Sequence, residues 1–274
     1  MENKQFESVY KFRSWDNKHH KRLLTHNEIC FASPAKFNDP FDCKLHFRYD
    51  LECRDSFMEY LRELNKENGN FLSEEELIQK AENAIQVFSD PNRLKEMLKQ
   101  DEHKINEKYR VFSMTGIYSN NLLWSHYSSD HQGFCVEFNL KKLQEYFDKN
   151  FNHNFIEFPI IYNSEAPKLV LSKFGIEGFQ ELLKYKSRDW EYENEYRFLI
   201  YKRTDLQKYI HEELIPKESI SKVILGCQVS DEHKKEIIAV LNQYPDKPIL
   251  EQAIRLPFSY KLIFEKIEYY YNNQ

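Results

Sequence analysis

The stretch that decides the fold is Trp190-Glu191-Tyr192-Glu193-Asn194-Glu195-Tyr196-Arg197-Phe198-Leu199-Ile200. Its aromatic and branched residues predict a strand from Glu193 to Tyr201. Alternate residues of a strand share a face, so Glu193, Glu195 and Arg197 are expected together, opposite the aromatic and aliphatic side chains. The stretch therefore predicts a strand that carries two carboxylates and a guanidinium on one side.

These two carboxylates suggest a site for chemistry. One strand repeat separates them by roughly 7 Å, so they should repel each other. We expect the pKa of one to be shifted upward, while Arg197 holds the other ionised. Such a pair can stabilise a cation or steer a nucleophile. The alternative is a solvated edge face with one weak salt bridge.

Working outward from this strand, the pattern predicts a single α+β domain over residues 1–274, with a helical insertion at about 50–109. Ser73 with Glu76 forms a capping box, and Asp90 before Pro91 starts another helix, so the insertion should hold about three helices. Further strands are predicted at 8–12, 28–32, 109–114, 133–139, 155–162, 222–225, 249–256 and 261–271, and further helices at 21–26, 122–127, 140–149, 168–185 and 231–243.

The composition limits the function. The chain of 274 residues is 41% hydrophobic, enough for one sizeable core. Its 6 glycines form neither of the common Gly-rich phosphate motifs. A formal charge of -5 argues against a general nucleic-acid binder, and no apolar run could span a membrane. The five scattered cysteines are expected to be reduced thiols of a cytoplasmic protein without a membrane partner.

Two other segments carry candidate residues. Trp124, His126 and Tyr127 precede a predicted strand and could offer a flat surface to a bound ring. The alternative is a packed turn with Trp124 in the core and His126 at a helix end. The Asn38-Asp39-Pro40-Phe41-Asp42 box could bind a metal or substrate, but such residues more often stabilise their own turn.

Four boxes together resemble the bacterial family known as domain of unknown function 2971. They are Val9-Tyr10-Lys11-Phe12-Arg13, FASPAKFNDPFD, LWSHYSSDHQGFCVEF and Lys186-x-x-x-Trp190-x-x-Glu193-x-Glu195-x-Arg197. The resemblance spans about residues 9 to 226. It implies relatives but no established activity.

The chain is more distantly similar to ADP-ribosyltransferases. This similarity implies a mostly antiparallel, split β-sheet core that binds NAD between its two sheets. In that comparison Arg13 or Lys11 occupies the first-strand position. Ser33, or Ser113-Met114-Thr115, could serve in the middle, and Glu193-Asn194-Glu195 matches the late E-x-E motif.

The same similarity implies roles for these residues. Glu195 would hold the nicotinamide ribose and stabilise the cation that forms as nicotinamide leaves, and Glu193 would orient or deprotonate the acceptor. Arg13 would contact phosphate or ribose. The expected NAD-binding set also includes Lys11, Ser33, Trp124, His126, Tyr127 and Arg197, and no metal is expected. The implied function is NAD-consuming ADP-ribosyl transfer or NAD hydrolysis by a toxin or antiphage effector, with a macromolecular acceptor.

Two alternatives come from other classes of protein. A non-catalytic module that binds a nucleotide or a partner protein would hold Glu193 and Glu195 in fixed salt bridges within a closed surface. A metal-dependent nuclease would need Asp39, Asp42 and Glu195 to converge within about 5 to 6 Å.

Overall fold

The computed structural model describes residues 6–151, 154–175, 178–201 and 210–269. Its described part is a mixed α+β fold built on a mostly antiparallel sheet of ten strands, which confirms the predicted class. One path through the sheet runs β12-β11-β10-β4-β1-β3-β2-β9, and β8 pairs with β3 and β5 beside it. The strands are β1 (Ser8–Arg13), β2 (Glu28–Ala32), β3 (Tyr109–Thr115), β4 (Phe134–Asn139), β5 (Phe155–Pro159), β8 (Glu195–Tyr201), β9 (Ile210–Leu214), β10 (Ile220–Leu225), β11 (Ile249–Arg255) and β12 (Leu262–Lys266).

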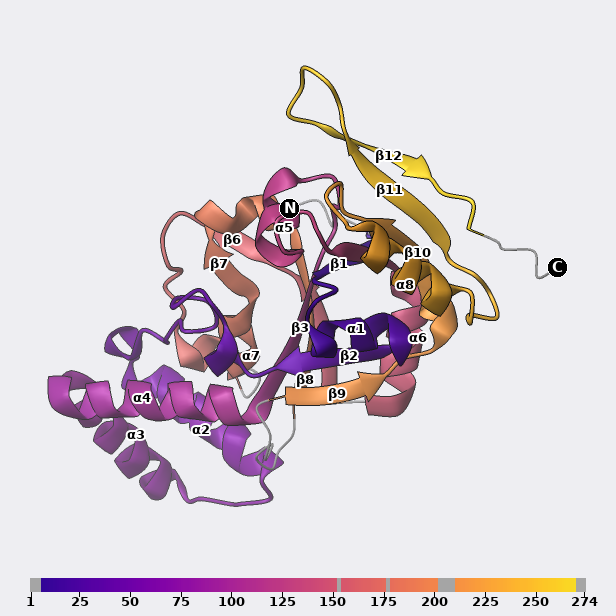
Figure 1. Ribbon diagram of the computed structural model, residues 1–274. Coiled ribbons are helices and arrows are strands. Elements are labelled where there is room, and N and C mark those ends of the chain that lie inside the picture. The colour runs from indigo at the N-terminus through magenta and orange to yellow at the C-terminus, as the bar shows by residue number, and fades with distance from the viewer. Residues whose placement is uncertain (1–5, 152–153, 176–177, 202–209, 270–274) are drawn as a thin grey trace.

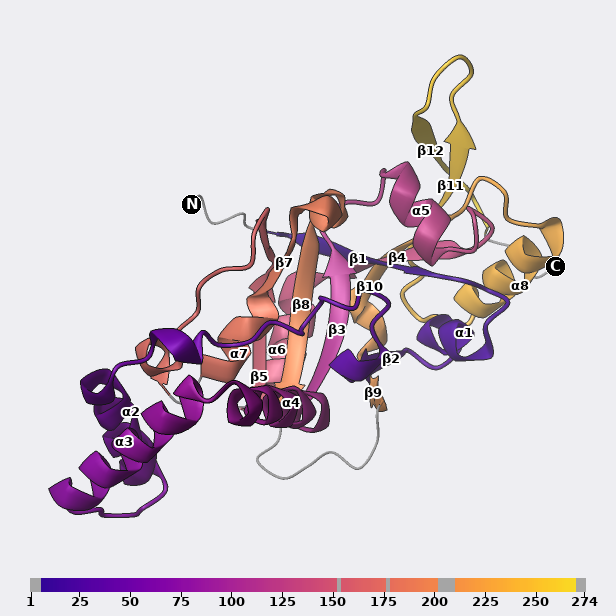
Figure 2. The ribbon, with the colours of Figure 1, turned by 90° about the vertical axis from the view of Figure 1, so that its left-hand side faces the viewer.

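The pairing between β1 and β3 is short. β1 pairs with β4 along its whole length, and β3 pairs with β8 from Tyr109↔Tyr201 to Thr115↔Glu195. Between β1 and β3, however, the printed register is the single pair Tyr10↔Thr115. Figure 2 shows β1 crossing the end of β3 and β8 at a large angle. Lys11 and Arg13 of β1 and Glu195 of β8 line one cavity there.

Helices cover the sheet and form a separate lobe (Figure 1). α1 (Lys18–Thr25), α6 (Leu140–Phe151) and α8 (Asp231–Leu241) contribute to the main core, where Phe134, Val136 and Phe138 point inward as predicted. The lobe consists of α2 (Arg54–Glu67), α3 (Glu74–Ser89) and α4 (Pro91–Lys108), and it has the predicted capping box and Asp90 cap. α5 (Asn121–Tyr127) precedes β4.

The predicted helix at 168–185 is wrong. The chain there forms short turns, η4 (Leu171–Lys173), α7 (Gly178–Glu181) and η6 (Leu182–Lys184), before β7 (Tyr185–Ser187). Gly175 has a φ of +59°, and Gly178 lies close to Phe47 and Leu171, so glycine interrupts the helical pattern. Residues 176–177 lie outside the described part.

Two strand predictions also need correction, and one strand was not predicted. The 155–162 strand breaks after Pro159, which lacks an N–H, into β5 and β6 (Ile161–Asn163). The last strand ends at Lys266, and residues 270–271 of that prediction lie outside the described part. The pattern missed β9, which pairs with β2.

Within the described residues, the structure contains no helix that combines the length and apolar character required to cross a membrane.

Gly133 permits the close approach on which the position of Arg13 depends. A Cβ at Gly133 would lie 2.1 Å from the carbonyl oxygen of Arg13. Gly133→Ala should therefore lower the free energy of unfolding by about 1–3 kcal/mol, as overpacking does, in a urea titration. Gly133 does not have a positive φ, so crowding rather than backbone strain should cause this loss. Asp246→Ala, at an exposed position, is the control and should change the free energy of unfolding by less than about 0.5 kcal/mol. A Gly133→Ala variant as stable as this control would contradict the close-contact argument.

Candidate functional site

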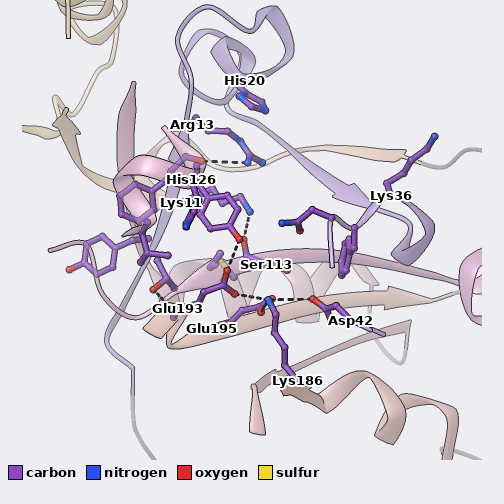
Figure 3. A pocket seen from close by; sticks show the side chains of 18 residues that line it. Lys11, Arg13, His20, Lys36, Asp42, Ser113, His126, Lys186, Glu193 and Glu195 are labelled. Atoms are coloured by element: carbon purple, nitrogen blue, oxygen red, sulfur yellow. Dashed lines mark hydrogen bonds and ion pairs between the residues drawn. The ribbon is translucent and has the colours of Figure 1, made fainter. Parts of the chain in front are cut away.

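A cavity of about 400 Å³ opens where β1 meets β3 and β8. β1 supplies Lys11 and Arg13, β3 supplies Ser113 and Thr115, and β8 begins with Glu195. Further lining residues come from α1, the loop before η2 (Tyr49–Leu51), α5 and β7: His20, Lys36, Phe37, Asn38, Asp42, Leu123, His126, Tyr127 and Lys186. Figure 3 shows Arg13 and His20 on one side of this space and the carboxylates on the other.

Lys11 and Arg13 form the cationic wall. Within the described part of the chain neither makes an ion pair; Lys11 Nζ donates to the carbonyl of Ser113, and an Arg13 amino group lies 3.5 Å from the carbonyl of Phe12. Burial and the neighbouring Arg13 lower the pKa of Lys11 well below its ordinary value. Burial also lowers the pKa of Arg13, to about 10, so the guanidinium stays charged at neutral pH.

His20 lies beside this wall and remains neutral. Asn17 caps α1 by accepting from the N–H groups of His19 and His20, which fixes the first helical turn. The N–H of Ser14 donates to His20 Nδ1 at 3.2 Å, so neutral His20 carries its proton on Nε2. Burial, together with Arg13 and Lys11, lowers the pKa of His20 to about 4.

The opposite wall is built by a tight turn before β8. Glu193 is the last residue of η7 (Arg188–Glu193), and Asn194 adopts a left-handed conformation with φ 44° and ψ 52°. The predicted strand start at Glu193 is thus two residues too early, because β8 begins at Glu195. The turn nevertheless brings both carboxylates to the cavity, where they are only 5% and 4% exposed. The solvated-edge alternative is therefore wrong.

One ammonium group joins the carboxylates of this wall. Lys186 Nζ lies 2.6 Å from Glu193 Oε2, 3.1 Å from Glu195 Oε2 and 3.4 Å from Asp42 Oδ2. The Tyr127 hydroxyl donates to Glu193 Oε1 at 2.5 Å. Burial alone would lower the pKa of Lys186, but the three carboxylates raise it above its ordinary value. Lys186 is therefore a fixed cation.

Arg197 lies beneath this wall and is fully buried. Its Nε donates to Glu195 Oε1 at 2.6 Å, and one amino group donates to both oxygens of Asp42 at 2.8 and 2.7 Å. The other amino group reaches Cys43 Sγ at 3.0 Å and the Leu183 carbonyl at 3.2 Å. Arg197 thus fastens the loop around Asp42 to β8.

The two glutamates titrate in opposite directions, as expected. Burial raises the pKa of Glu193, and the charge of Glu195 adds to this rise against the opposing effect of Lys186. Burial would also raise the pKa of Glu195, but Arg197 and Lys186 outweigh it and hold that pKa well below its ordinary value. The site therefore pairs a permanent carboxylate with one that takes up a proton more readily.

The structure brings together most of the predicted site residues. Glu193, Glu195, Arg13, Lys11, His126 and Tyr127 all line the cavity. Arg197 does not line it but supports it from below. Trp124 packs in a core cluster with Phe12 and Leu123, which fits the packed-turn alternative. Ser33 is also buried away from the cavity: its hydroxyl caps η1 (Pro34–Lys36) and donates to the Asn106 carbonyl.

Of the three carboxylates that a metal-dependent nuclease would need, only Asp42 and Glu195 lie close to each other. Asp42 and Glu195 share Lys186 and Arg197, but Asp39 lines a neighbouring cavity instead. The ammonium and guanidinium groups occupy the positions between the carboxylates where a metal ion would have to bind. Among the described residues, no group of three or more His, Cys, Asp or Glu side chains could hold a metal.

Sequence reasoning missed the chemical role of Lys186 and the participation of His20, Lys36 and Phe37. Lys186 belongs to the Lys-x-x-x-Trp-x-x-Glu-x-Glu-x-Arg box, so its spacing from the carboxylates was a usable signal. His20 gave a weaker signal, because it reaches the cavity only through the packing of α1 against β2.

The raised pKa of Glu193 predicts a pH dependence. Its ordinary value is 4.5, and the folded chain binds the proton more tightly than the unfolded chain. The free energy of unfolding should then fall as pH rises from 4.5 through the folded-state pKa. Glu193→Gln lacks this titration, so its stability relative to wild type should rise over the same interval in urea titrations.

Glu191→Gln serves as the matched control, because Glu191 is exposed two residues away. Its stability relative to wild type should change little with pH. A relative stability of Glu193→Gln that stays constant or falls as the pH increases would refute the assigned direction of the pKa shift.

Comparisons with known proteins agree with part of the resemblance noted in the sequence. No curated protein and no solved structure gave a significant match to the chain. Residues 123–198 match the sequence model of a family described as "Protein of unknown function (DUF2971)". The matched region runs from α5 through β8 and includes Tyr127, Lys186, Glu193, Glu195 and Arg197. The match supports the resemblance to that family of unknown function over the carboxylate wall of the cavity.

Proposed function

We propose that the cavity binds NAD and that the chain breaks the bond between nicotinamide and ribose, passing ADP-ribose to a macromolecular acceptor or to water. One observation carries the proposal: two basic side chains that form no ion pair among the described residues, Lys11 and Arg13, face a buried pair of carboxylates across one cavity. NAD combines an anionic pyrophosphate with a ribose at which positive charge develops on bond cleavage. Each wall thus suits a different part of the same molecule.

The cationic wall fits the pyrophosphate. Arg13 offers a planar fork of N–H donors, the geometry that binds phosphate oxygens well. An anion close to Lys11 would favour the charged amine and reverse the lowering of its pKa. Neutral His20 adds a donor without adding repulsion between cations. Phosphate binding would thereby relieve the mutual repulsion of Lys11 and Arg13.

The carboxylate wall fits the reacting ribose. When the C1′–N bond breaks, its electron pair leaves with nicotinamide and positive charge develops at C1′. Glu195 remains ionised at any physiological pH, so it can stabilise that charge. Glu193 can accept the proton of the attacking hydroxyl or amine as the new bond to C1′ forms, because its raised pKa makes it the more basic of the two carboxylates.

Aromatic side chains complete the cavity. Tyr10, Phe12, Phe37 and Tyr127 line it, and His126 lies at an exposed position. Such rings can hold the flat bases of a dinucleotide without the backbone cradle that glycine-rich motifs provide.

A second candidate is a module that binds the nucleotide without cleaving it. It is favoured by the engagement of both Glu195 oxygens, since Oε1 accepts from Arg197 while Oε2 accepts from Lys186 and Arg197. These are the fixed salt bridges expected of a sensor. The open cavity above these salt bridges does not fit the second candidate, because a sensor of that kind was expected to have a closed surface.

The proposal predicts nicotinamide release when purified protein is incubated with labelled NAD, with and without cell lysate. Glu195→Gln should reduce release at least about 100-fold, the usual effect of removing one electrostatic contact to a developing charge. Arg13→Gln should weaken NAD binding at least about tenfold, because a charge-assisted phosphate contact is lost. Arg255→Gln, at an exposed position on β11, should match wild type. Thermal unfolding checks that each variant is folded.

The outcomes separate the two candidates. Binding of NAD that depends on Arg13, without release of nicotinamide or transfer of label, would identify the non-catalytic module. Absence of both binding and release in the folded protein would reject NAD as the ligand.

A further inference from the structure

A second cavity of about 410 Å³ lies beside the first. Its walls include three aromatic residues, Phe41, Trp190 and Tyr192, and two acidic residues, Asp39 and Asp189. No basic side chain is among the described residues that line it. This composition is opposite in charge to the wall formed by Lys11 and Arg13.

The aromatic residues form an accessible surface. Phe41 is 72% exposed, so a ligand in the cavity can reach its ring. The Trp190 and Tyr192 rings lie with centroids 6.0 Å apart and their planes at 36°. Aromatic faces carry partial negative charge and attract cations. The ring of Trp190 is already in contact with one cation, because Lys186 Nζ lies 4.9 Å from its centre.

The acidic residues leave negative charge at the cavity. Asp39 Oδ1 accepts the N–H of Phe41 at 2.9 Å, but its Oδ2 has no hydrogen-bond partner in the described part of the chain. Asp39 is only 6% exposed, so its charge is weakly screened by water. Lys186 does not neutralise this charge, because it is held by Asp42, Glu193 and Glu195.

From this geometry we propose that the second cavity binds a guanidinium group. A planar cation can stack on an aromatic ring while its edge lies toward carboxylates. Arg188 does not line this cavity and pairs with Glu191 at 3.6 Å. The proposal does not depend on NAD as the ligand of the first cavity.

Fluorescence offers a direct measurement. Trp15 and Trp124 are 2% and 0% exposed, so Trp190 is the tryptophan that a ligand can reach. Ethylguanidinium should change the emission of the full-length protein in a saturable way. Ethylurea, its neutral counterpart of similar shape, should not. Equal binding of the two probes overturns the proposal.

Variants locate the site. Asp39→Asn should weaken ethylguanidinium binding about tenfold, the scale of a desolvated contact of this kind, while its amide oxygen can still accept the Phe41 N–H. Asp246→Asn, a change of equal charge at an exposed position, should bind like wild type. Arg13→Gln should also bind like wild type, which separates this cavity from the first. Wild-type affinity in a folded Asp39→Asn variant would refute the assignment.

The source of the guanidinium is addressed by a second probe, a pentapeptide with one arginine between glycines and with blocked ends. Tighter binding of the peptide than of ethylguanidinium identifies a side chain of a polypeptide as the ligand. Tighter binding of ethylguanidinium identifies a small molecule. Failure of both probes to bind overturns the proposal.

Discussion

A guanidinium that is removed from water must be matched by charge and by hydrogen bonds, and Arg197 meets this requirement with groups from three segments. Its partners are Asp42 and Cys43 in the loop after η1, Leu183 in the turn before β7, and Glu195 on its own strand. Removing one member of such a buried set typically costs about 3–5 kcal/mol. The position of the whole carboxylate wall depends on this cluster, because the same carboxylates hold Lys186.

Charge is distributed unevenly around the first cavity as a result. The carboxylate wall contains its own counterions, Lys186 and Arg197, so its ionised groups are nearly balanced. Within the described residues the wall formed by Lys11 and Arg13 makes no ion pair, and burial together with Arg13 lowers the pKa of Lys11. A charge that is removed from water without an opposite charge beside it is unfavourable for stability. The proposal that this cavity binds an anion rests on that imbalance.

The sequence predicted the parts of this arrangement that follow from local rules. The α+β class, the three helices after residue 50 and the caps at Ser73 and Asp90 rest on periodicity and capping, and the structure has them. The E-x-E stretch predicted two interacting carboxylates beside Arg197, and the structure has Glu193 and Glu195 buried at one cavity with Arg197 bonded to Glu195. Their catalytic role stays a prediction. Trp124 could not be distinguished from a ligand-binding residue, since core packing and ring stacking use the same side chain.

Other features depend on tertiary context and could not be predicted locally. The 168–185 segment has helical spacing, yet glycines and contacts with the lobe leave it as short turns. The left-handed Asn194 moves Glu193 out of the strand, and only the fold reveals that Lys186 then reaches three carboxylates. β9 was missed because its pairing with β2 spans a long separation in the chain.

The two walls of the first cavity also differ in when they are made. During synthesis Lys11 and Arg13 leave the ribosome long before Lys186, Glu193, Glu195 and Arg197, and β3 separates them in the chain. A nascent chain that has reached β4 can pair β1 with β4, but the wall of the cavity formed by Lys186, Glu193 and Glu195 has not yet been synthesised. Long-range pairing, such as that of β3 with β8, is slow to form. The complete cavity therefore exists only after β8 has emerged and paired with β3.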